Sequence, residues 1–235
     1  FDYDLPNDTV YAETCASIGL IFFANRMLRL EPKAEYADVM ERALYNIVIG
    51  SMAADGKHYF YVNHLEVWPD ACRRNPGKHH VKPVRQRWFG CACCPPNLAR
   101  LIASLGGYIW TREEQTLYAH LYIGNETAVS FGGRLIRVRM TSGLPWEGAA
   151  SLNVETESPV RFRLALRLPA WTSGEACIRL NGDVLRDAPV RDGYLMIDRE
   201  WRSGDTVDLL FPMEAEWMEA RPEVRADRGK VALVR

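Results

Sequence analysis

Residues 91–97, with the sequence CACCPPN, hold three of the six cysteines of this 235-residue chain within four positions. Neighbouring thiols are natural soft ligands for zinc or iron, and a thiolate is also a strong nucleophile. A second ligand pair, Glu13 and Cys15, lies far upstream. Together with Cys93 and Cys94 it supplies one carboxylate and three thiolates, a four-ligand set that suits Zn²⁺. The sequence therefore predicts a zinc site built from two separate segments.

Helices are expected to carry both segments. An N-cap at Asn7 or Asp8, followed by apolar residues near a 3.6-residue period, predicts a helix over residues 9–30. A second amphipathic helix is expected over residues 34–52, which makes an αα-hairpin with the first. A third should begin at the prolines after Cys94 and end near residues 106–107.

The chain between the second and third helices has a different pattern. Residues 57–68 are rich in aromatic and branched side chains and are expected to be extended. Residues 69–88 are polar and contain a Pro-Gly turn, which predicts a long loop. The neighbouring His79 and His80 in this loop are either metal ligands or a solvated pair, and the lack of spaced partners favours the second interpretation.

From residue 115 the pattern changes to short runs, many of them alternating, separated by turns rich in Gly, Asn and Asp. Such spacing is typical of a β-sandwich. The predicted fold class is therefore α+β and multidomain, with helices in residues 1–114 and a β-sandwich in residues 115–235. The expected strands cover residues 117–123, 128–131, 134–140, 151–155, 160–168, 176–180, 194–197 and 206–211.

The charge balance disfavours two classes of partner. With 29 basic and 30 acidic residues, the chain has no basic field for nucleic acid and no polybasic patch for an anionic membrane. Cys72 and Cys177 stand alone without the spacing of a disulfide framework, so reduced or metal-bound thiols in a cytoplasmic setting are expected. The chain begins at Phe1 in what reads as the interior of a longer sequence, which leaves export open.

Several motifs together resemble one family of enzymes. They are YDLPN at residues 3–7, YAETCA at 11–16, YFYVN at 59–63, FGCACCPPN at 89–97 and LRLPAW at 166–171. These segments closely resemble the β-L-arabinofuranosidase family, glycoside hydrolase family 127, formerly a domain of unknown function. The resemblance implies an (α/α)6 barrel followed by β-sandwich domains, with this chain, as a truncated fragment, holding the last barrel helices and the first sandwich.

The resemblance also implies site residues and a reaction. Glu13, Cys15, Cys93 and Cys94 match the family's zinc ligands, and Cys93 matches its nucleophile. Tyr61 corresponds to a tyrosine that contacts the sugar. The implied activity is retaining hydrolysis of β-L-arabinofuranosides in plant-derived glycans, so the expected partner is an oligosaccharide or glycoside, with a homodimer as an open option. The family's acid/base glutamate falls just before Phe1, so this chain alone is expected to be inactive.

Three alternatives remain open from the residues. A relative acting on another rare sugar, such as an aceric acid linkage, would share these motifs. A non-catalytic carbohydrate-binding module with a structural zinc ion would keep the four ligands without the chemistry. An iron-sulfur or redox protein is disfavoured by the carboxylate in the ligand set. Cys91 is expected to be a packing neighbour of the site, since four ligands are already assigned.

Overall fold

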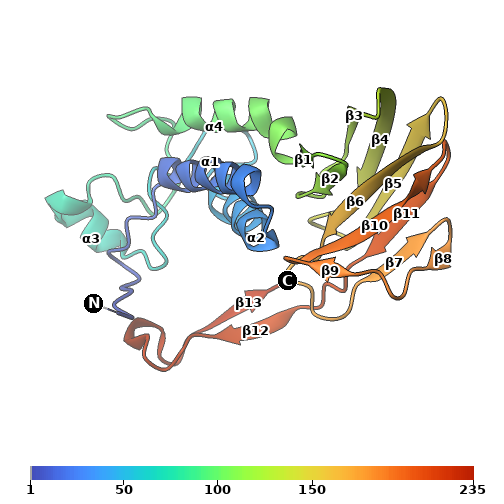
Figure 1. The fold of residues 1–235 in the computed structure, drawn as a ribbon. Helices are drawn as coiled ribbons and strands as arrows, with labels where there is room; N and C mark the ends of the chain where they lie inside the picture. Colours follow the sequence, from blue (N-terminus) through green and yellow to red (C-terminus); the bar gives the residue numbers. More distant parts are fainter. Residues whose placement is uncertain (1) are drawn as a thin grey trace. The chain divides into compact units, whose positions relative to one another are not determined.

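The computed structural model describes residues 2–235, which combine helices with β-sheets (Figure 1). The chain divides into two compact units. The first holds the chain up to Phe23 together with Val39–Ala103 and Ala215–Val234, and the second holds Ala24–Asp38, Ser104–Glu214 and Arg235. Within the described residues, none of the helices combines the length and the apolar character needed to cross a bilayer.

The helical elements are mostly those expected, with different bounds. They are α1 (Thr14–Leu30), α2 (Ala34–Arg42), the π-helix η1 (Ala43–Val48), α3 (Pro69–Arg74), α4 (Cys94–Ser104) and the 3₁₀ turns η2 (Pro76–Lys78) and η3 (Leu105–Tyr108). The predicted loop over residues 69–88 therefore contains a short helix and a 3₁₀ turn. Pro69 and Pro76 each occupy a first helical position, where a missing N–H costs nothing.

The first helix begins at Thr14 and not at residue 9 as predicted, because the preceding residues make other contacts. Glu13 forms an isolated antiparallel bridge with Val62, and the Thr14 backbone N–H donates to the Tyr61 carbonyl at 3.0 Å. The expected cap residue Asn7 donates its amide to Asp227 Oδ1 at 2.7 Å instead. Tertiary hydrogen bonds thus replace the local cap.

The second helix changes its hydrogen-bonding pattern partway along. It is α-helical to Arg42 and continues as a π-helix to Val48, where the Ile49 N–H donates to the Leu44 carbonyl at 2.9 Å. It ends short of the predicted residue 52. The segment predicted to be extended, residues 57–68, makes only isolated bridges, which pair Tyr59 with Met52 and with Gln86 besides the one at Val62.

Two sheets form the second unit. The five-stranded sheet has the order β1-β2-β6-β10-β9, and the six-stranded sheet has the order β3-β4-β5-β11-β7-β8. Neighbouring strands are antiparallel except for the parallel pair β2 and β6. The strands are β1 (Trp110–Glu113), β2 (Thr116–Ala119), β3 (Asn125–Phe131), β4 (Arg134–Ser142), β5 (Ala149–Thr156), β6 (Val160–Arg167), β7 (Cys177–Leu180), β8 (Asp183–Val184), β9 (Val190–Arg191), β10 (Tyr194–Trp201) and β11 (Thr206–Leu210).

One hydrophobic core joins the two sheets, as a β-sandwich requires. In β4 the alternate residues Ile136, Val138 and Met140 are buried, and β6 supplies Phe162 to the same core. Phe131 of the six-stranded sheet stacks on Phe162 of the five-stranded sheet, with ring centroids 4.9 Å apart. Full burial of each such side chain stabilises the fold by roughly 1.5–3 kcal/mol.

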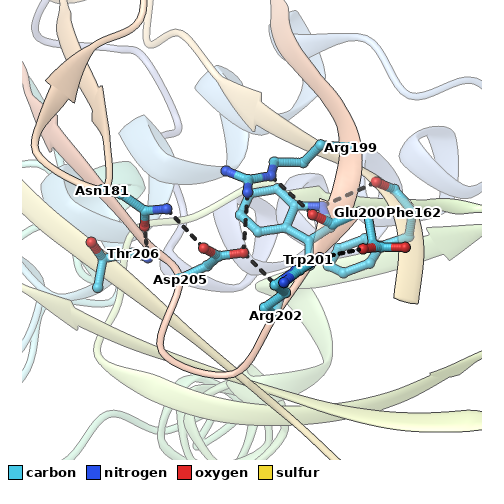
Figure 2. A network of polar contacts seen from close by, with 8 residues as sticks. All are labelled: Phe162, Asn181, Arg199, Glu200, Trp201, Arg202, Asp205 and Thr206. Carbon is cyan, nitrogen blue, oxygen red and sulfur yellow. Dashed lines mark hydrogen bonds and ion pairs between the residues drawn. The ribbon is translucent and has the colours of Figure 1, made fainter. Parts of the chain in front are cut away.

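A network around Asp205 fixes the turn between β10 and β11 (Figure 2). Its carboxylate accepts hydrogen bonds from the Asn181 amide at 2.7 Å and from the Arg202 backbone N–H at 2.8 Å. Arg199 lies 3.6 Å from the same carboxylate and 5.4 Å above the ring of Trp201. Asn181, at φ 53°, also accepts from the Thr206 N–H at 2.8 Å, so this turn and the turn after β7 hold each other in place.

The end of the chain forms a separate two-stranded sheet. It consists of β12 (Glu216–Glu219) and β13 (Val231–Val234), with the 3₁₀ turn η4 (Arg225–Asp227) between them, and it belongs to the first unit. The division into a helical domain to residue 114 and a sandwich domain from residue 115 stays a prediction.

Candidate active site

Both predicted ligand segments lie at the beginnings of helices. Cys15 is in the first turn of α1, and Cys94 is the first residue of α4. Cys93 precedes α4 directly, with its carbonyl accepting from the Asn97 N–H at 3.3 Å. Unpaired backbone N–H groups and the helix dipole make such positions favourable for thiolates. The Thr14 hydroxyl further ties the start of α1 to the Phe60 carbonyl at 2.9 Å.

The four predicted ligands converge at one point of the first unit. Cys15 Sγ lies 3.4 Å from Cys93 Sγ and 3.6 Å from Cys94 Sγ, and the two adjacent cysteines have their sulfurs 3.9 Å apart. Glu13 Oε1 lies 3.6 Å from Cys93 Sγ. All four ligand atoms lie within 4.8 Å of one another, so the group is able to hold a metal ion. A disulfide bond is about 2.05 Å long, and all these thiols are free.

Burial disfavours negative charge on the most enclosed thiol of this group. Burial raises the pKa of the Cys94 thiol well above its ordinary value, and the contacts with Cys15 and Cys93 add to the effect. Cys94 is 1% exposed, so water does little to stabilise a negative charge there. A dication among the sulfurs would reverse this balance and favour the thiolates.

Tyr61 lies beside the sulfur predicted to be nucleophilic. Its phenol oxygen is 3.5 Å from Cys93 Sγ, and this hydrogen bond, followed by burial, raises the pKa of the Tyr61 phenol. Phe89 packs on the Tyr61 ring with centroids 5.7 Å apart. Cys93 and Tyr61 are both partly exposed, whereas Cys94 is buried. Because it is partly exposed, Cys93 is within reach of a molecule from solvent.

The site is also bordered by residues that the ligand pattern did not predict. His80 contacts the rings of Tyr11 and Tyr61, with centroid distances of 5.2 and 6.1 Å. Burial, and then the neighbouring His79, lowers the pKa of His80, which keeps its ring neutral at pH 7. Neither histidine belongs to the four-ligand group. Spacing in the sequence gives no signal that this part of the 69–88 segment reaches Tyr61.

The remaining cysteines lie outside the group of ligands. Cys91 is exposed, although it is only two residues from Cys93. Cys72 is buried with Val62 and Val81, and Cys177 is partly buried at the start of β7. The structure thus brings together the four residues predicted as ligands and leaves the other three cysteines outside the group, while their role as ligands stays a prediction.

Comparison with known proteins identifies the class of molecule. Residues 1–107 match the family model described as β-L-arabinofuranosidase, GH127 catalytic domain, and residues 116–213 match the GH127 middle domain. The two matches belong to the same family and cover most of the chain. The chain therefore belongs to glycoside hydrolase family 127, as its motifs predicted.

Particular relatives support this membership. The chain is 43% identical over its whole length to the non-reducing end β-L-arabinofuranosidase of Bifidobacterium longum subsp. longum. It is 54% identical to a GH127 β-L-arabinofuranosidase of known structure from Geobacillus stearothermophilus T6, with a TM-score of 0.93 over 99% of the chain. A second solved GH127 β-arabinofuranosidase is 34% identical, with a TM-score of 0.87 over 99% of the chain. The chain spans 36%, 36% and 37% of these three relatives.

Proposed function

We propose that the complete protein is a retaining glycoside hydrolase that removes β-L-arabinofuranosyl residues from plant-derived glycans, with Cys93 as nucleophile. The observation that carries this proposal is the convergence of Glu13, Cys15, Cys93 and Cys94, with Cys93 hydrogen-bonded to the Tyr61 hydroxyl. The names of the relatives supply the substrate class. The helices of the first unit are then the last helices of an (α/α)6 barrel, and the acid/base glutamate lies outside these 235 residues.

Four of the six distances among the ligand atoms are close to those of a tetrahedral zinc site. Zn–S bonds of about 2.3 Å at the tetrahedral angle place two sulfurs about 3.8 Å apart, and a Zn–O bond of about 2.1 Å places the oxygen about 3.6 Å from a sulfur. The sulfur pairs lie at 3.4, 3.6 and 3.9 Å and the oxygen–sulfur pair at 3.6 Å. When bound, zinc would keep the thiols ionised at neutral pH.

The reaction follows the two-step logic of retaining glycosidases. Cys93 Sγ attacks the anomeric carbon, a sulfur–carbon bond forms, and the bond to the leaving oxygen breaks as the acid/base glutamate protonates that oxygen. Water, deprotonated by the same glutamate, then displaces the sulfur, so two inversions give net retention. Tyr61 is the proposed sugar contact because its hydroxyl lies against the attacking sulfur.

Replacement of the nucleophile tests this proposal. Cys93→Ser in the complete protein is expected to reduce kcat on an aryl β-L-arabinofuranoside by more than about 100-fold, because an alcohol is a far weaker nucleophile and metal ligand than a thiolate. Circular dichroism checks that the variant is folded. Cys177→Ser, which changes a cysteine of β7 in the other unit, is the matched control and should retain activity.

A sugar-like haloacetamide separates catalysis from a purely structural metal site. It should label Cys93 selectively and be slowed by substrate. Retention of more than about a hundredth of the rate by Cys93→Ser would point to another nucleophile. Absence of both activity and selective labelling in the unsubstituted protein would favour the non-catalytic module.

A further inference from the structure

Asn97 contacts the ligand group from outside. It lies in α4, one turn after Cys93, and its Nδ2 atom is 3.2 Å from Cys15 Sγ on α1. The family resemblance gave this residue no role, and it is not one of the four potential ligands. An amide N–H that points at a sulfur stabilises negative charge on that sulfur.

Arg100 decides which way the Asn97 amide faces. Its Nη2 atom lies 3.0 Å from Asn97 Oδ1, and a guanidinium group only donates hydrogen bonds. The amide oxygen must therefore face Arg100, which leaves the amide NH₂ directed at Cys15. The Arg100 guanidinium also lies 4.7 Å above the Phe22 ring, two turns after Cys15 on the same helix. Contacts between α1 and α4 thus hold the amide in one orientation.

The three sulfurs of the ligand group have different environments. Cys94 is 1% exposed and out of reach of a substrate. Cys15 accepts the N–H of Asn97, whereas Cys93 faces the hydroxyl of Tyr61. Partners outside a metal's own ligands commonly set which ligand is fixed and how strongly it binds.

We propose that Asn97, oriented by Arg100, is a positioning residue that holds Cys15 as a fixed, unreactive ligand and so leaves Cys93 as the sulfur that attacks. This inference rests on the proposed function, because it assigns different roles to sulfurs of the same metal centre. Removal of the N–H donor should raise the energy of the Cys15 lone pairs and increase their reactivity. It should also weaken zinc binding, because Cys15 is then no longer held in position.

The test uses the complete protein loaded with Co²⁺, whose sulfur-to-cobalt charge-transfer band reports on the thiolates. Asn97→Leu removes the donor and should shift this band to longer wavelength and weaken zinc affinity by about tenfold in competition with a chromophoric chelator. Iodoacetamide, followed by peptide mapping, should modify Cys15 several times faster in this variant than in the unsubstituted protein. Asn46→Leu is the matched control, since Asn46 is an exposed helical asparagine whose side-chain amide donates to the Arg42 carbonyl.

Arg100→Met keeps the test decisive if Asn97→Leu does not fold. Arg100 is exposed, and its loss should shift the same band in the same direction by a smaller amount because the amide is then free to rotate. If a folded variant kept the cobalt band, the zinc affinity and the Cys15 labelling rate of the unsubstituted protein, the proposed role of Asn97 would be overturned. The proposed metal centre would not be affected by that result. Failure of the unsubstituted protein to bind cobalt or zinc would instead overturn the proposed metal centre.

Discussion

Single residues decide what chemistry the thiol cluster is able to do. Three sulfurs within 3.9 Å of one another are costly as free thiolates, so a metal ion is the natural counter-charge for this group. The partial exposure of Cys93 and its hydrogen bond with the Tyr61 hydroxyl distinguish it from Cys94. The Cys93 side chain is thus suited to be both a metal ligand and a nucleophile.

Loss of two ligands is expected to empty the site. The purified protein should contain about one zinc ion per chain, and the Cys15→Ala, Cys94→Ala double variant should contain almost none, because a carboxylate and one thiolate bind zinc far more weakly than four ligands. Elemental analysis by mass spectrometry measures the ratio. The matched control is Cys72→Ala, Cys177→Ala, which should keep the zinc. An unchanged zinc content in the first variant would refute the ligand assignment.

His120 is a buried group that should make stability depend on pH. Its ring lies 2.6 Å from the Tyr194 hydroxyl and 2.7 Å from the Thr111 hydroxyl, and the Arg167 guanidinium bonds its carbonyl at 2.6 Å. Burial, and then the positive charge of Arg167, lowers the pKa of His120 to about 3. Asp38, which pairs with Arg167, is the acidic group on the facing element.

The direction of this pH dependence follows from proton binding at His120 in the folded and unfolded states. Between about pH 3 and pH 6.5 the unfolded state binds a proton at this histidine and the folded state does not, so stability is lost as the pH falls below 6.5. The contribution lost between pH 7 and pH 5 is about 2 kcal/mol. Urea unfolding followed by tryptophan fluorescence should show that His120→Gln loses less stability over this interval than the unsubstituted protein. His58→Gln, which removes a partly exposed histidine paired with Asp55, is the control. Equal losses in all three proteins would contradict the argument.

At the scale of elements, the sandwich depends on polar groups at its turns as well as on its apolar core. The Asp205 carboxylate satisfies the Arg202 N–H and the Asn181 amide, which belong to turns after two different strands (Figure 2). Asp205 is 8% exposed, whereas Arg202 and Asn181 are exposed residues. Loss of Asp205 therefore removes two hydrogen bonds to a buried acceptor, which is more costly than the loss of a hydrogen bond between two exposed groups.

Asp205→Ala is expected to lower the free energy of unfolding by about 1–3 kcal/mol, because two hydrogen bonds to a buried, charged acceptor are lost. Chemical denaturation of the protein measures the change. Asp183→Ala, at an exposed position of β8, should change stability by less than about 0.5 kcal/mol. Equal effects of the two substitutions would show that the network does not stabilise the turns.

At the scale of the whole molecule, the question is how much of an active enzyme these 235 residues supply. They span 36% of the length of the Bifidobacterium relative, and they contain the candidate nucleophile and metal ligands together with one sandwich. Hydrolysis also needs an acid that protonates the leaving oxygen, and general acid catalysis contributes about 10²- to 10⁴-fold. The resemblance places that glutamate before Phe1.

The 235-residue chain expressed alone is therefore expected to bind zinc without hydrolysing any glycoside. A chromogenic β-L-arabinofuranoside provides the assay, and the complete protein provides the positive control. Activity of the short chain that disappears in Cys93→Ser would show that the acid lies within these residues. Asp2 and Asp4 would then be the first candidates, because they lie nearest to the expected position of the glutamate.

The sequence by itself determined the family, the presence of helices and sheets, and the four candidate ligands. Periodicity located the long helices and most strands, because each buries one apolar face. Clustered cysteines, with Glu13 and Cys15 upstream, pointed to a group that the structure brings together and that is able to hold a metal ion. Local patterns of this kind involve residues that are close together in the sequence, so they are recognisable from the sequence alone.

Only the tertiary structure decided how segments far apart along the chain meet. In the structure α1 begins at Thr14 and not at residue 9, because the backbone at Glu13 and Thr14 pairs with Val62 and Tyr61. It placed His80 against Tyr61 and the Asn97 amide against Cys15, although no spacing in the sequence relates these pairs. Such contacts depend on the packing of α1, α4 and the 69–88 segment together, and long-range packing overrides the local signals from which a sequence is read.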